Sequence, residues 1–217
     1  MRALLALLLF ASSALQEGEK LFLDNNPQQA QPLLEQALSE SPQEERIYLY
    51  LGIVYEQLGD AKNALQVLRR GLEVAKQYRD LFYYNIGNNL FKQGELTLAE
   101  EMYTKALEAN RRLEDAYLNR ANSRLKLERL AEAREDYIGF LRLAPGSPQR
   151  EEIEKLIALL GGILEQEEQK RQEQALKQKA LLDEVLSTLQ NASENAKNLS
   201  AGSEKIEERY EDIDIAD

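Results

Sequence analysis

Small and large apolar residues recur along the first two thirds of the chain in a pattern that returns every 34 or 35 positions. Four segments superpose on it, namely residues 14–42, 48–76, 83–111 and 117–145. Around two small positions in each copy, large apolar residues at i, i+3, i+4 and i+7 predict two helices, each with one apolar face. The small positions are Gly18 and Ala30, Gly52 and Ala64, Gly87 and Ala99, and Ala121 and Ala133.

A turn between the two helical stretches makes each copy a predicted helical hairpin. A small residue on each helix lets the two backbones approach closely. One hairpin cannot bury its own apolar face, so neighbouring hairpins must stack. We therefore expect an all-α solenoid of antiparallel helix pairs. The turn residues are Asn25-Asn26-Pro27, Gly59-Asp60, Gly94-Glu95 and Glu128-Arg129.

The repeated register resembles the tetratricopeptide repeat (TPR) family over residues 11–145. The resemblance implies a right-handed superhelix with repeats at 11–44, 45–79, 80–113 and 114–147. It also implies a non-catalytic scaffold or adaptor that binds a partner segment in its concave groove. Gly71 departs from the family, which usually has Ala there. The resemblance is carried chiefly by Tyr48, Gly52, Gly59 and Ala64, by Tyr83, Gly87, Gly94, Ala99 and Tyr103, and by Tyr117, Ala121, Ala133 and Tyr137.

The same resemblance implies that the first helix of each repeat lines the groove. Asn85 matches Asn119 across copies, and Asn88 matches Asn122. Asn is a poor helix former, and its amide both donates and accepts, so a ladder of amides suits an extended peptide. The alternative is that these residues simply face water. The predicted peptide-binding residues are Tyr50, Tyr84, Asn85, Asn88, Lys92, Asn119, Asn122 and Lys126.

Some family members clamp a terminal carboxylate of their ligand with Lys, Asn and Arg. Here Leu49, Tyr84 and Asp115 occupy positions where the clamp lysines would lie. The acidic balance of the chain also opposes such a ligand. A carboxylate clamp is therefore a poor match.

After the repeats we expect a capping helix at 148–161, followed by a break or a kink at Gly161-Gly162. A polar and then amphipathic helix should follow at 162–190, and a flexible acidic tail at 191–217. The amphipathic helix either covers the last repeat, docks in a partner's groove or associates with itself. Its apolar residues, the predicted partner-binding set, are Leu182, Val185, Leu186 and Leu189.

Residues 1–14 have the pattern of a signal peptide, with Arg2 before an apolar stretch at 3–10 and small residues at 11–14. The stretch is much shorter than the roughly 20 residues of a membrane-spanning helix. We therefore expect export to the periplasm or outside the cell, with no membrane span after cleavage. In the alternative, Leu4 starts an apolar helix on the first repeat, and the protein is cytoplasmic or held at the membrane by an uncleaved N-terminus.

Composition argues against catalysis. The 217 residues include no His and no Cys, which removes the commonest general base, thiol chemistry, thiolate metal sites and disulfides. No Gly-rich phosphate loop follows a strand. We expect no enzyme activity, cofactor, metal or catalytic residue, and a net charge of −11 opposes nucleic acid as a partner. Two alternatives to an adaptor stay open, a structural subunit of an envelope assembly and a cytoplasmic co-chaperone-like module.

Overall fold

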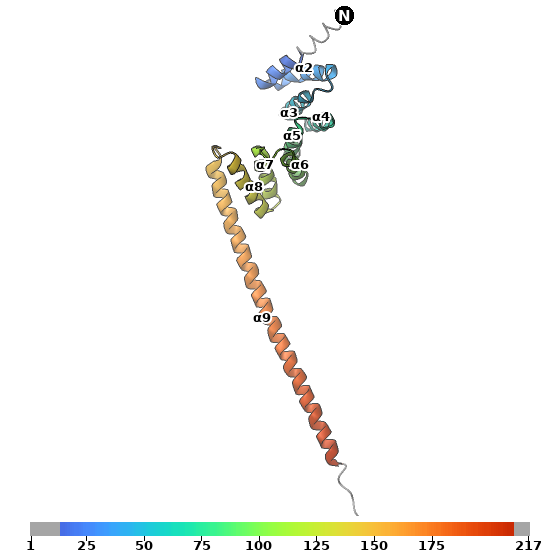
Figure 1. Cartoon of the computed structure of the whole chain (residues 1–217), viewed down its shortest axis with the longest axis vertical. Helices are drawn as coiled ribbons and strands as arrows, with labels where there is room; N and C mark the ends of the chain where they lie inside the picture. The colour runs from blue at the N-terminus through green and yellow to red at the C-terminus, as the bar shows by residue number, and fades with distance from the viewer. Residues whose placement is uncertain (1–13, 211–217) are drawn as a thin grey trace, which may run out of the picture. The chain divides into compact units, whose positions relative to one another are not determined.

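The computed structural model describes the backbone of residues 14–210 and the side chains of residues 14–197. All regular structure in this range is helical, and consecutive helices pack together along the repeats (Figure 1). The predicted all-α solenoid is confirmed; residues 1–13, with most of the predicted signal peptide, lie outside the described range. The helices are residues 14–23, α2 (Pro27–Glu40), α3 (Glu45–Gln57), α4 (Ala61–Val74), α5 (Arg79–Lys92), α6 (Leu96–Ala109), α7 (Glu114–Lys126), α8 (Leu130–Leu143) and α9 (Arg150–Tyr210).

The turn inside each hairpin has one repeated geometry. A residue with positive φ ends the first helix of every copy, and the next backbone N–H donates back across the last turn, as Asp60 does to the carbonyl of Tyr55 at 2.8 Å. This is the left-handed helix end that favours Gly, and two of the four copies have Gly there. The four residues are Asn25 (φ 55°), Gly59 (79°), Gly94 (81°) and Glu128 (60°).

The small residues of the repeat lie where the two helices of a hairpin meet. Ala30, Ala64, Ala99 and Ala133 are all fully buried. A Cβ added to Gly52 would lie 2.4 Å from the Leu68 side chain, and one added to Gly87 would lie 2.7 Å from the Tyr103 ring. The predicted close approach between the paired helices is therefore present.

Gly71 in α4 has a different reason to be small. A Cβ at this position would lie 2.2 Å from the ring of Phe82 on α5 and 2.7 Å from the Cβ of Tyr48 on α3. The corresponding pair in the next repeat is Ala106 with Ala116. The departure from the family's usual Ala is thus matched by a larger residue on the next helix.

The end of the solenoid is covered by the first turns of α9. Ile153 and Leu160 are buried there with Tyr137 and Phe140 of α8. These turns therefore cap the solenoid, but the predicted end of the capping helix at residue 161 is wrong, because α9 continues through Gly161 and Gly162. Gly161 leaves room for the Arg134 side chain, whose Nε donates to the carbonyl of Ile157 at 3.3 Å.

The chain divides into two units, residues up to Gly162 and residues from Ile163 onward. In the second unit α9 continues to Tyr210, so the predicted flexible tail is helical over residues 191–210. Residues 211–217 lie outside the described range. Strong helix formers dominate this unit, and pairs such as Glu173 with Lys177 at 2.7 Å add support along the exposed helix.

Gly71→Ala should destabilise the solenoid, because the added methyl group overpacks the contact with Phe82 and Tyr48. We expect the free energy of unfolding to fall by about 1–3 kcal/mol. Urea unfolding followed by circular dichroism measures this change. Gly162→Ala is the matched control, since nothing lies within 4 Å of its added Cβ, and it should not lower stability. Equal losses in both variants would contradict the packing argument.

Candidate functional site

Two of the predicted groove asparagines accept hydrogen bonds from tyrosine hydroxyls of the same repeat. Asn88 on α5 accepts a hydrogen bond from Tyr103 on α6 at 2.9 Å, and Asn122 on α7 accepts one from Tyr137 on α8 at 2.7 Å. The second repeat has apolar residues, Ile53 and Leu68, at the same two positions. A buried hydroxyl needs a partner, so an amide accompanies each tyrosine. This pairing gives a structural reason for Asn in the middle of these helices.

A third amide joins neighbouring repeats. The Nδ2 of Asn119 on α7 donates to the Oδ1 of Asn88 at 2.9 Å and to the hydroxyl of Tyr84 at 3.2 Å. The Tyr84 and Tyr103 rings lie with their centroids 6.0 Å apart. Burial raises the pKa of both tyrosines, and it raises the pKa of Tyr137 to about 12. The hydroxyls therefore stay neutral and act as donors or acceptors at physiological pH.

The remaining predicted residues do not all line one continuous site. Asn85 is buried and donates to the Leu81 carbonyl of its own helix at 2.8 Å, which makes it the groove asparagine least available to a ligand. Tyr50 donates to Glu19 at 2.7 Å. Lys92 is exposed and ion-paired with Glu56, and the Lys126 ammonium lies 5.6 Å from the centroid of the Phe91 ring.

The internal bonds leave one polar atom of Asn122 and one of Asn119 unused. Among the described residues, the Nδ2 of Asn122 and the Oδ1 of Asn119 have no hydrogen-bond partner. No fully buried side-chain polar atom in that range lacks a partner, so these two atoms are not fully buried. One donor and one acceptor thus remain available to a ligand on α7.

A cavity of about 440 Å³ adjoins Asn122. Leu118 and Asn122 come from α7 and Tyr137 from α8, while Ile153 and Leu156 come from the first turns of α9. The wall therefore combines apolar and polar side chains, with one free amide N–H beside the apolar ones. The other lining residues are Pro148, Gln149 and Glu152.

An ion-pair network between α6, α7 and α8 was not expected from the sequence. The guanidinium of Arg120 binds both carboxylate oxygens of Asp136, at 2.8 and 2.7 Å, although Asp136 is only 3% exposed. Arg124 joins Asp136 at 2.7 Å to the largely buried Glu100 at 2.9 Å. Glu100 also pairs with Arg129 at 2.5 Å. Every charge in this network has an opposite partner, which limits the cost of burying it.

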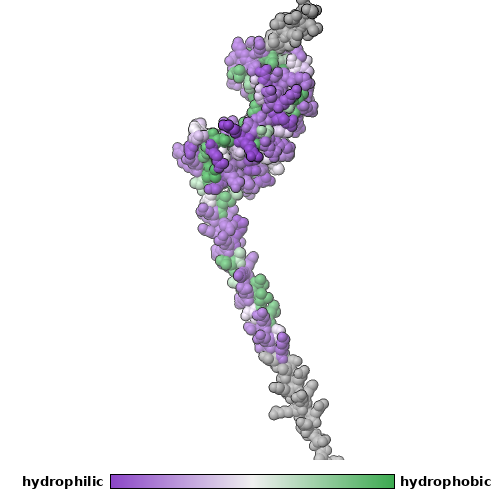
Figure 2. Space-filling view, viewed as in Figure 1, coloured by the Kyte–Doolittle hydropathy of each residue, from purple (hydrophilic) through white to green (hydrophobic). Residues whose placement is uncertain are grey.

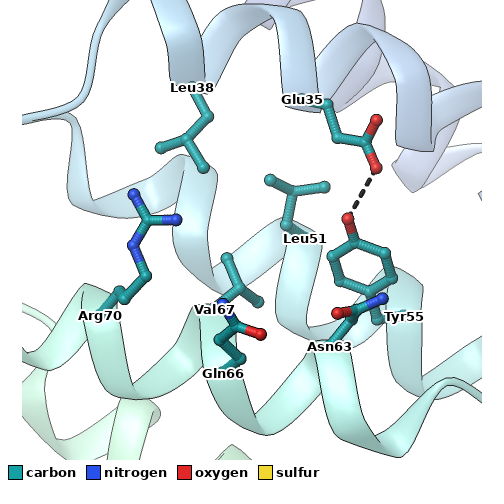
Figure 3. Close-up of a pocket in the computed structure, with 8 residues that line it drawn as sticks. All are labelled: Glu35, Leu38, Leu51, Tyr55, Asn63, Gln66, Val67 and Arg70. Atoms are coloured by element: carbon teal, nitrogen blue, oxygen red, sulfur yellow. Dashed lines mark hydrogen bonds between the residues drawn. The ribbon is translucent and has the colours of Figure 1, made fainter.

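The sequence does contain a sign of this network, because two positions that are apolar in the second repeat are both charged in the fourth. Arg120 occupies the position of Leu51 in the second repeat, and Asp136 occupies that of Val67. Around Leu51 and Val67 the structure instead has a cavity of about 220 Å³, beside which Tyr55 donates to Glu35 at 2.6 Å (Figure 3). One interhelical position therefore holds an ion pair in one repeat and an apolar pair in another.

The predicted partner-binding residues lie in the second unit. Leu182, Val185, Leu186 and Leu189 are all exposed. Over the described residues, no helix is long and apolar enough to span a membrane, and no cluster of acidic side chains has the arrangement of a metal site.

The fold and the groove define the class of protein, a solenoid of stacked helical hairpins. Two profiles, both described as tetratricopeptide repeat, match residues 21–82 and 84–148. The chain therefore belongs to the tetratricopeptide repeat family. No curated protein matches its sequence.

Several solved structures have the same fold. MamA is 21% identical in sequence, with 71% of this chain and 96% of that chain covered and a TM-score of 0.54. YrrB, described as a TPR protein with an unusual peptide-binding site, is 18% identical over 70% and 76%, with a TM-score of 0.58. The first TPR of Spaghetti (RPAP3), bound to the HSP90 peptide SRMEEVD, is 24% identical over 56% and 96%, with a TM-score of 0.50.

Asn88→Ala should destabilise the fold, because it leaves the Tyr103 hydroxyl without its acceptor. We expect a loss of about 1–3 kcal/mol in the free energy of unfolding, measured by urea denaturation. Tyr103→Phe removes the hydroxyl itself, so the double variant should lose much less than the sum of the two single losses. Strictly additive losses would contradict the hydrogen bond.

Proposed function

We propose that this protein is a non-catalytic scaffold that holds an extended segment of a partner protein in the groove lined by α5, α7 and the start of α9. The observation that carries the proposal is the cavity beside Asn122, where apolar side chains and an unused amide N–H adjoin. A concave apolar site with a few polar groups is the usual form of a ligand pocket. Membership of the tetratricopeptide repeat family supports a binding function of this kind.

The free amide atoms suit a peptide backbone. An extended segment presents N–H and C=O groups alternately, and the groove offers the Nδ2 of Asn122 as a donor and the Oδ1 of Asn119 as an acceptor. The internal bonds of both amides hold them in place. A ligand would therefore meet preorganised groups, and less rotamer entropy would be lost on binding.

The cavity favours one kind of side chain. Leu118, Ile153 and Leu156 provide apolar contacts, while Glu152 adds a carboxylate that has no ion-pair partner among the described residues. The net charge of −11 adds a long-range attraction for cations. We infer that the preferred segment places an apolar residue in the cavity next to a Lys or Arg.

An acidic ligand like the HSP90 peptide bound to the first TPR of RPAP3 does not fit this groove. Leu49 is buried, Tyr84 accepts a hydrogen bond from Asn119, and Asp115 is exposed as a further negative charge. None of these three side chains supplies a positive charge for a carboxylate. The proposal therefore favours a basic partner segment over an acidic one.

Asn122→Leu in a Tyr137→Phe background, compared with Tyr137→Phe alone, tests the amide donor, because it removes the amide without adding a charge and without leaving the Tyr137 hydroxyl unpaired. It should weaken binding of groove-selected peptides about tenfold, the cost of losing one hydrogen bond, with little change in stability. The peptides are selected from a displayed random library against the wild-type protein, and affinities are measured by fluorescence anisotropy. Enrichment of an apolar residue beside Lys or Arg is the expected result.

Glu152→Lys reverses the charge at the same cavity and should weaken those peptides further. Glu165→Lys is its matched control, because it makes the same change in net charge at an exposed residue that does not line the cavity. Selected peptides that bind both cavity variants as tightly as the wild type would rule out this groove as the site.

We also propose export, on the basis of the N-terminal sequence pattern. Ala14, the last residue of the predicted signal peptide, is buried in the core of the first repeat, so cleavage after it would remove one core contact. N-terminal sequencing of the protein from its native cell should find a mature terminus close to Leu15. An intact Met1 in the purified protein would contradict cleavage and favour the cytoplasmic or membrane-held alternative.

A further inference from the structure

The second unit carries a concentrated apolar surface on a fully exposed helix. Every residue from 165 to 197 is exposed, and the large apolar side chains at 181–189 are 47–62% exposed. Figure 2 shows them as green patches along α9. An apolar face that is exposed to water costs free energy, so a helix that carries one is stabilised when another surface covers that face. The residues are Leu181, Leu182, Val185, Leu186 and Leu189.

These residues follow a seven-residue repeat. Ala175, Leu182, Leu189 and Ala196 are separated by seven positions each. Val185 and Ala192 lie three positions after two of them, and the polar Gln178 lies three positions after Ala175. These are the a and d positions of a heptad. In the sequence, Leu199 and Ile206 continue the d positions. A straight helix drifts by about 20° for each heptad, so a sustained repeat of this kind favours supercoiling around a partner with the same repeat.

The flanking positions allow two identical helices to lie parallel and in register. Leu181 is at a g position and Leu186 at the e position five residues later, so each would face the other across a parallel pair. Between residues 173 and 197, Lys179 is the only charged residue at e or g, so no like charges meet there. The acidic residues all lie at b, c or f, on the far side: Glu173, Asp183, Glu184 and Glu194.

We propose that the protein self-associates through a parallel, in-register coiled coil formed by residues 175–196 of α9. The covering surface is a second copy of this chain, because each copy supplies the same heptad seam and the same Leu181–Leu186 pairing. The seam is about 33 Å long at 1.5 Å per residue. Leu181 and Leu186, at g and e, widen its apolar face beyond the a and d positions.

Size-exclusion chromatography of the full-length protein, with light scattering to measure the mass of the eluted species, tests self-association. The wild type should elute as an oligomer at micromolar concentration. The double variant Leu182→Glu with Leu189→Glu should raise the dissociation constant more than about 100-fold, because it places carboxylates in the seam. Leu176→Glu is the matched control, since Leu176 is exposed but lies at a b position off the seam, and it should leave the oligomer unchanged.

Circular dichroism of the repeats' unfolding transition shows whether each variant is folded. A wild type that is still monomeric at about 100 µM, roughly 100 times the concentration at which the oligomer is expected, would overturn the proposal and leave a helix of another protein as the occupant. Equal effects of the seam variant and Leu176→Glu would overturn it as well, because they would indicate dependence on general hydrophobicity and not on the heptad.

The absence of native cysteine allows a direct test of direction and register. Ala196→Cys puts one thiol at an a position, where two copies in parallel register come within disulfide distance. Mild oxidation should cross-link this variant almost completely, whereas Lys197→Cys at the adjacent b position should cross-link much less. Equal cross-linking of the two variants, or none in Ala196→Cys, would overturn the parallel register.

Discussion

The close approach of the two helices in each hairpin is the constraint on which the rest of the solenoid depends. It requires a small residue at Gly52 or Gly87 and a large one packed directly against it, Leu68 or Tyr103. When the large residue is Leu, the neighbouring position on the first helix is the apolar Ile53. When it is Tyr, its hydroxyl lies partly buried between the helices, and Asn88 accepts the hydrogen bond that this hydroxyl donates. The polar character of the groove in the third and fourth repeats thus begins with the choice of aromatic residue in the core.

The contacts between neighbouring repeats follow the same logic of paired exchange. Gly71 is small because Phe82 is large, and Arg124 is charged because Glu100 of the preceding repeat faces it. Replacing one member of such a pair leaves a clash or an unpaired buried charge, which costs far more than exchanging both. The residues of such a pair can therefore change only together. Because each pair joins two particular hairpins, the pairs determine which hairpin stacks on which.

The sequence was sufficient for the repeat register but not for the bonds within it. Gly59 and Gly94 predicted the turns, and the spacing of Ala64 and Ala99 predicted the helix contacts, since both depend on local size and backbone freedom. The partner of an amide depends on the rotamers of residues 15 to 35 positions away, so the bonds of Asn88 and Asn119 could not be predicted. The expected break at Gly161-Gly162 is absent because the strong helix formers that follow outweigh the poor helix propensity of two glycines. The clearance that Arg134 needs at Gly161 depends on a residue 27 positions away, so it has no local signal in the sequence.

The division of each groove amide between the fold and a ligand limits how strongly one groove can bind. The Asn122 Oδ1 is committed to Tyr137, so a partner gains only the remaining N–H and the apolar contacts of one open cavity. Few hydrogen bonds of about 1 kcal/mol each, set against the entropy of ordering an extended segment, give weak and exchangeable binding. Several grooves joined in one assembly would bind a repetitive or clustered partner far more tightly than one groove, because each later contact is intramolecular. Self-association through α9 would join several grooves in this way without a change in the groove itself. A groove of low affinity and a long exposed helix are therefore consistent with one scaffold.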